Sequence, residues 1–265
     1  MKFTQKSLGD AANISTGREG ALRDYRRIFL FVLVGLVLMN LAVWAAVEIA
    51  VRFISFEQEA AMFGGLFWAD EDENDDPALR PFQEVFDVIR THPDVPPIKF
   101  RLRRMESKDP NAFAVIGGVI AVTDGLIEAI EEDEIAIAFL LGHELGHFHN
   151  RDHLRGAGRA LLLAGCQRVF FPYGGGDLVG GMTHAAIVTA YSRKQEEEAD
   201  RFGLRLVYET YGSTDGAIRL FELLDDERRL PEWAYMFTTH PGPQTRIQRL
   251  RAELVRMTSG NEKTR

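Results

Sequence analysis

The chain has 265 residues, which is enough for one sizeable domain with additions or for two small domains. Apolar residues make up 46% of it and charged residues 26%, so most of the chain can fold around a core. The net charge of −8 argues against a nucleic-acid partner, because few cations remain to neutralise phosphates. The single cysteine, Cys166, excludes an internal disulfide and a cysteine-based zinc site.

An uncharged apolar run near the N-terminus extends from Ile28 to Val47. At about 1.5 Å per residue, such a helix matches a hydrocarbon core of roughly 30 Å. A cleaved signal peptide is less favoured, because the charged region before the run is long and the run exceeds a typical signal core. We therefore expect a leader at 1–27 and a transmembrane helix at 28–51.

The charges on the two sides of this run differ in sign. Six cations precede it, whereas Arg52 is followed by Glu57, Glu59 and an acidic stretch. The cations are Lys2, Lys6, Arg18, Arg23, Arg26 and Arg27. The positive-inside rule then predicts a cytoplasmic leader and places everything after Val51 outside the cytoplasm, on the periplasmic side of the inner membrane if the chain is bacterial.

The rest of the chain predicts an α+β domain, mostly helical with a small β-sheet, over residues 77–257. An acidic linker (52–76) precedes it and a polar tail (258–265) follows it. Apolar spacing predicts a helix from about 79 to 89, alternation predicts a half-exposed strand at 100–103, and two apolar strands flank the turn at Gly117–Gly118. Further helices are expected at 133–150, 154–169, 178–191, 193–211, 214–229 and 243–257. The apolar pieces within 160–190 are too short to span a membrane, and we expect them to be buried.

The motif with the clearest chemistry is His143-Glu144-Leu145-Gly146-His147. Positions i and i+4 share one face of a helix, so the two imidazoles can bind one ion while Glu144 reaches a water on it. By itself the motif is weak, since it occurs by chance in unrelated helices. The apolar stretch 135–141 before it indicates that the histidines come from a buried helix and need partners.

A zinc site needs a third protein ligand. A glutamate about twenty residues downstream is excluded, because residues 148–195 contain none. His153 would extend the motif in the manner of metzincins. Glu196, in the segment SRKQEEEAD, is favoured because Asp200 follows it at i+4, where that carboxylate could orient a ligand histidine.

The order of three motifs resembles the M48 family of zinc metalloproteases. These are HELGH at 143–147, SRKQEEEAD at 192–200 and THPGPQTRIQRL at 239–250. The resemblance runs from about Gln83 to Leu250. HtpX-like members of the family have several membrane spans, whereas only one is found in this sequence.

The resemblance implies a zincin-like fold, one Zn²⁺ per chain and the hydrolysis of peptide bonds, with the metal on His143, His147 and Glu196 and with Glu144 as catalytic base. It implies that Asp200 orients a ligand histidine and that His240 assists the transition state, for which Arg193 and Arg246 are weaker choices. The substrate strand would be Asn111, Ala112, Phe113 and Ala114. The expected partners are a protein substrate, unfolded or membrane-associated, and the membrane. A non-catalytic tethered scaffold and a soluble aminopeptidase are less favoured, because ligands and base are present and an anchor precedes the domain.

Overall fold

The computed structural model describes residues 14–64, 76–130, 133–170, 191–214, 216–217, 219–220 and 243–262. The chain divides into two compact units, Met1–Ala46 and Val47–Arg265. The helices expected at 178–191 and 214–229 lie largely outside the described residues, as does His240.

The first unit contains most of helix α1 (Ile14–Phe53). The helix begins earlier than expected, since residues 14–27 of the predicted leader belong to it. Its segment Leu22–Phe53 is long and apolar enough to cross a membrane. Several large apolar residues of this helix are more than half exposed, namely Ile28, Phe29, Phe31, Leu38, Leu41 and Trp44. This exposure is typical of a helix that faces lipid rather than a protein core.

A second helix, α2 (Phe56–Phe63), follows in the segment that the sequence suggested was a linker. Ser55 caps its N-terminus, accepting a hydrogen bond from the Gln58 backbone, while the Gln58 side chain returns one to Ser55 N. Glu59 of this helix is only 1% exposed, so one face of α2 is packed within the second unit.

A three-stranded mixed sheet forms one layer of the second unit, in the order β1-β3-β2. Strand β1 (Arg101–Met105) runs parallel to β3 (Val119–Thr123), and β2 (Ala112–Val115) is antiparallel to β3. The predicted hairpin around Gly117–Gly118 is therefore confirmed. Alternation of apolar and charged residues predicted that Arg103 of β1 is exposed, and this prediction is wrong, since Arg103 is only 5% exposed. The reason is that the face of the sheet that carries Phe113 and Val119 is buried as well.

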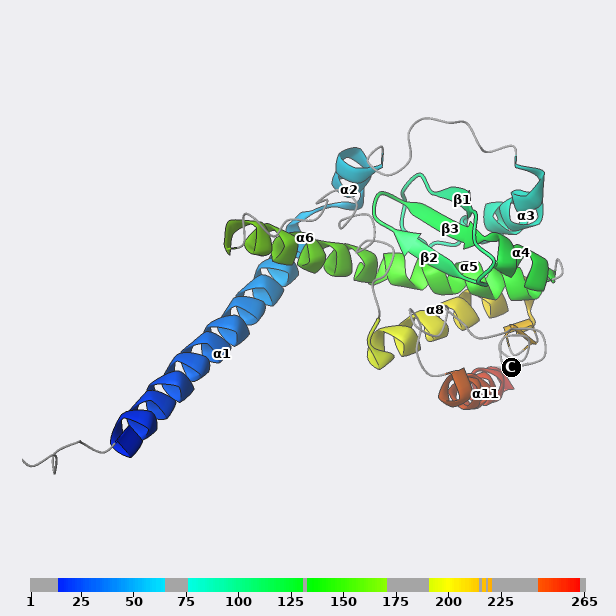
Figure 1. Cartoon of the computed structure of the whole chain (residues 1–265). Coiled ribbons are helices and arrows are strands. Elements are labelled where there is room, and N and C mark those ends of the chain that lie inside the picture. Colours follow the sequence, from blue (N-terminus) through cyan, green and yellow to red (C-terminus); the bar gives the residue numbers. More distant parts are fainter. Residues whose placement is uncertain are drawn as a thin grey trace, which may run out of the picture. The chain divides into compact units, whose positions relative to one another are not determined.

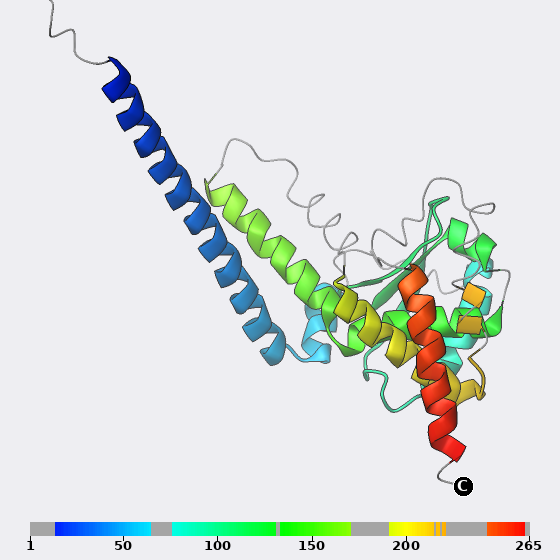
Figure 2. The ribbon, with the colours of Figure 1, turned by 90° about the horizontal axis from the view of Figure 1, so that it is seen from below.

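Helix α5 (Glu134–His149) lies against one face of this sheet, and α8 (Arg193–Tyr211) lies on the other side of α5 (Figure 1). The short turn η3 (Pro77–Leu79) leads into α3 (Arg80–Ile89), which packs on α5 as its apolar spacing predicted. Helix α4 (Asp124–Ala129) follows β3, and α6 (Asp152–Phe170) follows α5. Figure 2 shows that α11 (Pro243–Glu262) runs across α8.

Helix α6 differs from the expectation that the apolar residues after 160 are buried. Leu162 is 42% exposed and Cys166 is only partly buried. The side chains that α6 does bury lie near its start, where it packs on the end of α1 within the second unit. There Arg155 and Arg159 donate to Glu48, over 3.0 and 2.9 Å. The burial predicted for the apolar residues from 160 onward is therefore wrong for residues 160–166, the part of this segment whose side chains the structure describes.

The contact between α5 and α8 is close because small residues line it. A side chain at Gly146 would meet Ala199 Cα at 2.8 Å, and one at Gly142 would meet Gly203 Cα at 3.1 Å. The backbones of α5 and α8 must be this close for side chains one turn apart on each helix to reach the same point. Gly146 of the HELGH motif thus contributes to the site by allowing α5 to pack closely against α8.

Local signals set the bounds of both helices. Asp133 accepts hydrogen bonds from the backbones of Ile135 and Ala136 at the start of α5. Ser192 forms a capping box with Gln195 at the start of α8. Gly212, at φ +69°, ends α8 in the left-handed conformation that glycine adopts without steric cost. Both helices therefore lie where the sequence predicted them, at 133–150 and 193–211.

Candidate functional site

Two histidines of α5 converge on one point inside the molecule. His143 and His147 are one helical turn apart, and their side chains are 5% and 0% exposed. Their Nε2 atoms lie 3.2 Å from each other. Both rings therefore present the same nitrogen to a shared, water-poor position.

Glu196 of α8 completes this cluster, as the sequence predicted. Its Oε1 lies 3.5 Å from His147 Nε2, and its Oε2 lies 3.7 Å from His143 Nε2. The ligand atoms of the three residues are all within 4.8 Å of one another. Ligands at about 2.0–2.1 Å from a tetrahedral zinc ion lie ~3.3 Å apart, so the separations fit such an ion. Three buried residues from two helices could therefore hold a metal.

The outer nitrogen of each histidine meets a buried carboxylate. His143 Nδ1 is 3.0 Å from Asp200 Oδ1, and His147 Nδ1 is 3.1 Å from Asp152 Oδ2. A carboxylate in this position holds the proton on Nδ1 and turns the Nε2 lone pair toward the metal. Asp200 was expected in this role from the sequence, whereas Asp152 was not. The signal available for Asp152 was its place directly after the helix that carries both histidines.

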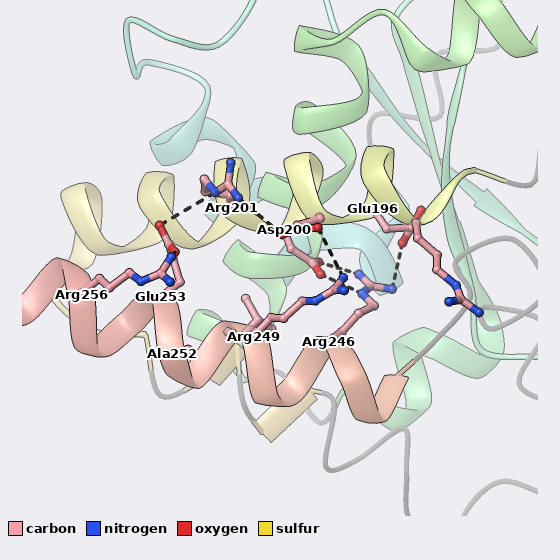
Figure 3. Close-up of a pocket in the computed structure, with 11 residues that line it drawn as sticks. Glu196, Asp200, Arg201, Arg246, Arg249, Ala252, Glu253 and Arg256 are labelled. Carbon is pink, nitrogen blue, oxygen red and sulfur yellow. Dashed lines mark hydrogen bonds and ion pairs between the residues drawn. The ribbon is translucent and has the colours of Figure 1, made fainter.

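Arg246 of α11 lies between the two carboxylates of α8 (Figure 3). Its Nη1 is 2.9 Å from Glu196 Oε2, while Nε and Nη2 donate to the two oxygens of Asp200 over 2.8 and 2.6 Å. This planar, two-pronged contact is the geometry that guanidinium and carboxylate groups favour. Arg246 therefore fixes Glu196 and Asp200. The alternative role considered from the sequence, as a donor to substrate, would require its N–H groups to leave these partners.

The charges around the histidines shift their pKa values in opposite directions. Burial lowers the pKa of His143, and the hydrogen bond to Asp200 only partly compensates. Burial opposes protonation of His147 too, but its bonds to Asp152 and Glu196 raise the pKa to about 9. For Asp200, burial alone would raise the pKa, whereas the charge of Arg246 and the bond from His143 lower it to about 2.

Glu144 and Tyr191 lie beside the cluster. Glu144 is 1% exposed, and its charge contributes to raising the pKa of both His147 and Tyr191. Burial is the larger cause of the raised pKa of Tyr191. The Tyr191 ring stacks on His147 with centroids 3.8 Å apart and planes inclined by 16°. This contact was not expected from the sequence, because nothing around Tyr191 relates it to a histidine 44 positions earlier.

Two other candidates from the sequence are not part of the three-residue cluster, although Arg193 lines one pocket together with Glu196 and Arg246. His153 is not part of the cluster, because its Nε2 is 2.6 Å from Glu59 Oε1. Arg193 is exposed at the first position of α8.

The proposed substrate strand forms β2, with Asn111 directly before it. Within the described sheet, β2 pairs with β3 alone and forms one edge. The Asn111 backbone N–H donates to Thr123 Oγ1 over 2.7 Å, which fixes the start of that edge. The strand contacts α5, so the helix with the histidines and the sheet edge are neighbours.

Comparison with known proteins matches residues 83–254 to the model of peptidase family M48. A protease HtpX homolog of Salinibacter ruber is 28% identical over 203 residues, covering 63% of this chain and 72% of that protein. The mitochondrial metalloendopeptidase OMA1 of Schizosaccharomyces pombe is 28% identical over 161 residues, covering 58% of this chain and 46% of that protein.

The metalloprotease YcaL of Escherichia coli is 30% identical over 157 residues, covering 56% of this chain and 60% of that protein. The chain thus spans about half to three quarters of the length of these relatives. The family match covers the cluster on α5 and α8 as well as the arginine of α11. The chain belongs to peptidase family M48, a family of metalloendopeptidases.

Proposed function

We propose that this protein is a membrane-anchored, zinc-dependent endopeptidase with Zn²⁺ on His143, His147 and Glu196. The observation that carries the proposal is the convergence of these three buried side chains within 4.8 Å, with a carboxylate behind each histidine. Two imidazoles and one carboxylate form a donor set that catalytic zinc sites use, with a fourth position left for water or substrate.

Each residue of the cluster has a distinct task in peptide hydrolysis. When bound, zinc supplies Lewis acidity that allows water to lose a proton near neutral pH. Glu144 accepts that proton and passes it to the leaving amine, so it serves first as base and then as acid. Asp200 and Asp152 keep the two histidines in the tautomer that binds metal, and Arg246 keeps Glu196 in place.

The substrate is proposed to lie extended beside residues 111–114. An edge strand offers main-chain groups to a peptide, and such hydrogen bonds do not depend on the peptide's sequence. This mode of binding suits unfolded chains, including those at a membrane surface. His240 is proposed to donate to the oxyanion, on the strength of its match to the late histidine of the family; it lies outside the described residues.

A direct test is zinc analysis together with proteolysis of an unfolded model protein, with and without a chelator, on the full chain in detergent. The proposal requires about one zinc ion per chain, cleavage at internal peptide bonds, and loss of cleavage on chelation. Release of single N-terminal residues would instead indicate an aminopeptidase, and zinc without cleavage would indicate a non-catalytic protein.

The anchor is proposed to place the second unit outside the cytoplasm. In sealed inverted membrane vesicles, the C-terminal part should be protected from added protease, because the cations before the apolar run at 28–47 stay on the cytoplasmic side. The leader should be cleaved in the same vesicles. Degradation of the C-terminal part in intact vesicles would reverse the proposed orientation.

Zinc uptake should release about one proton per chain at pH 7.5. Without metal, His147 is mostly protonated at this pH, because its pKa is about 9, and it must lose that proton to bind zinc. Zinc affinity should then rise about tenfold per pH unit between pH 7 and 9. Calorimetry in two buffers of different ionisation enthalpy measures the number of protons.

Asp152→Asn is the control for this measurement. It removes the carboxylate bonded to His147 Nδ1, which lowers the pKa of His147 and so reduces the number of protons released. Zinc binding by the unchanged protein without any proton release at pH 7.5 would contradict the prediction.

A further inference from the structure

Asp152 begins α6 directly after a short turn from α5, and it accepts on Oδ1 a hydrogen bond from Gln195 Nε2 over 2.7 Å. Arg151 precedes it and His153 follows it, and Arg151 is the one non-glycine residue of the described chain with positive φ, at +60°. A left-handed conformation is sterically unfavourable for an arginine and persists only where its surroundings hold it. Contacts outside the turn must therefore stabilise this conformation.

Those contacts come from α2, more than ninety positions earlier in the chain. Glu59 Oε2 accepts a hydrogen bond from Arg151 Nη2 over 3.1 Å, and Glu59 Oε1 lies 2.6 Å from His153 Nε2. Both residues that flank Asp152 thus meet the same carboxylate. Arg151 Nη1 donates in addition to Ile54 O over 2.7 Å, and its guanidinium lies 4.3 Å from the centre of the Phe56 ring.

The same carboxylate reaches the tip of the β2–β3 hairpin. Gly117 N donates to Glu59 Oε1 over 3.2 Å. Gly117 has φ +89°, and a side chain there would meet Gly64 at 2.8 Å, so the turn lies directly against the end of α2. Arg101 Nη1 donates to Gly64 O over 3.1 Å from the neighbouring strand. Glu59 therefore joins the edge hairpin to the turn that carries Asp152.

Glu59 is buried and charged, which makes its partners obligatory. Its exposure is 1%. Burial alone would raise its pKa, but the bonds from His153 and Gly117 and the charge of Arg151 together lower it. A buried carboxylate stripped of any of these partners would carry a large desolvation cost.

We propose that Glu59 is a positioning residue of the metal site, acting through Arg151 and His153 on Asp152 and so on His147. This inference rests on the proposed zinc site. It adds to that site a residue that lies before the region matched by the family, which begins at residue 83. The segment between the anchor and the peptidase domain, which contains α2, then contributes to the metal site and is not only a spacer.

The test is the zinc affinity of Glu59→Gln, measured by competition with a chelator. Glutamine keeps the size of the side chain and removes its charge. We expect affinity to fall about tenfold, at the lower end of the 10- to 100-fold range for outer partners of ligands, because Glu59 is one contact further out than Asp152. With cobalt in place of zinc, the visible absorption should shift as well, since it reports ligand geometry.

Glu57→Gln is the matched control. It makes the same change two positions earlier on α2, where Glu57 is exposed and bonds to Ser55 Oγ over 2.7 Å. Its zinc affinity and cobalt spectrum should equal those of the unchanged protein. A general effect of altering α2 would instead appear in both variants.

A cycle with Asp152→Asn separates positioning from mere stabilisation. If Glu59 acts through Asp152, the tenfold effect of Glu59→Gln should shrink to less than about twofold once Asp152 is already replaced. An equal effect in both backgrounds, or unchanged zinc affinity in Glu59→Gln, overturns the inference.

If Glu59→Gln does not fold, Arg151→Asn replaces it in the same measurements. Asparagine tolerates the left-handed backbone of this position but cannot reach Glu59, so zinc affinity should again fall about tenfold. Unchanged affinity in that variant overturns the inference. If the unchanged protein binds no zinc, the proposed function fails and this inference with it. If the unchanged protein binds zinc and cleaves its substrate, and the variants have the same zinc affinity as the unchanged protein, the inference fails while the proposed function stands.

Discussion

Glu144→Gln is expected to bind zinc as the unchanged protein does and to lose at least about 10²–10⁴-fold in kcat, the usual contribution of a general base. The amide cannot accept a proton, yet it has nearly the volume of the carboxylate and leaves the three ligand atoms where they are. The measurement is zinc content by elemental analysis beside the cleavage rate of an unfolded model protein.

His240→Ala is the comparison for this variant. A lost oxyanion donor costs about 10²–10³ in kcat, so this variant should keep zinc and lose no more activity than Glu144→Gln. Undiminished cleavage by Glu144→Gln would remove Glu144 from the role of base. A zinc-free Glu144→Gln variant would show that this carboxylate helps to hold the metal.

Glu196→Ala is expected to lose zinc, with an affinity lowered more than about 100-fold, since even the outer partners of a ligand are worth 10- to 100-fold. It removes one of three ligands, and it removes the carboxylate that faces Arg246 Nη1 in a buried position. Zinc content after dialysis against a weak chelator measures the loss. Glu196→Gln repeats the test with the shape of the side chain kept.

Two variants serve as controls for Glu196→Ala. Glu198→Ala removes an acid two positions further along α8, where it contacts Lys194 at the surface over 3.6 Å, and it should bind zinc normally. His153→Ala should also keep its zinc, with an affinity reduced at most about tenfold through Glu59, because His153 only supports the site. Loss of zinc in His153→Ala together with its retention in Glu196→Ala would make His153 the third ligand.

The features that the sequence predicted correctly depend on neighbours a few positions apart. The start of α5 follows from Asp133, and the start and end of α8 follow from Ser192 and Gly212. The hairpin at Gly117–Gly118 follows from the glycine pair between two apolar runs. Caps, turns and periodicity act within about one turn of chain, so one sequence contains all the information that they need.

Errors arose where a local pattern had a distant partner. The segment around Glu59 has the composition of a solvated linker, yet α2 is packed because Arg151, His153 and Gly117 neutralise and satisfy its buried carboxylate. Arg103 was expected to be exposed by alternation, but the second face of the sheet is buried as well. Alternation of apolar and polar residues distinguishes the two faces of a strand, but it does not show whether both faces are buried.

The sequence by itself determined helices α3, α5, α6, α8 and α11, the hairpin, the order of three motifs and the residue types suited to a metal. The tertiary structure agrees with the sequence in bringing Glu196 rather than His153 to the histidines. Only the tertiary structure decided the other contacts, namely Asp152 behind His147, Tyr191 on its ring, and Arg246 across Glu196 and Asp200. The reason is that these contacts depend on how closely α5 and α8 approach and on how α11 crosses α8, and such packing is set by shape across the whole core.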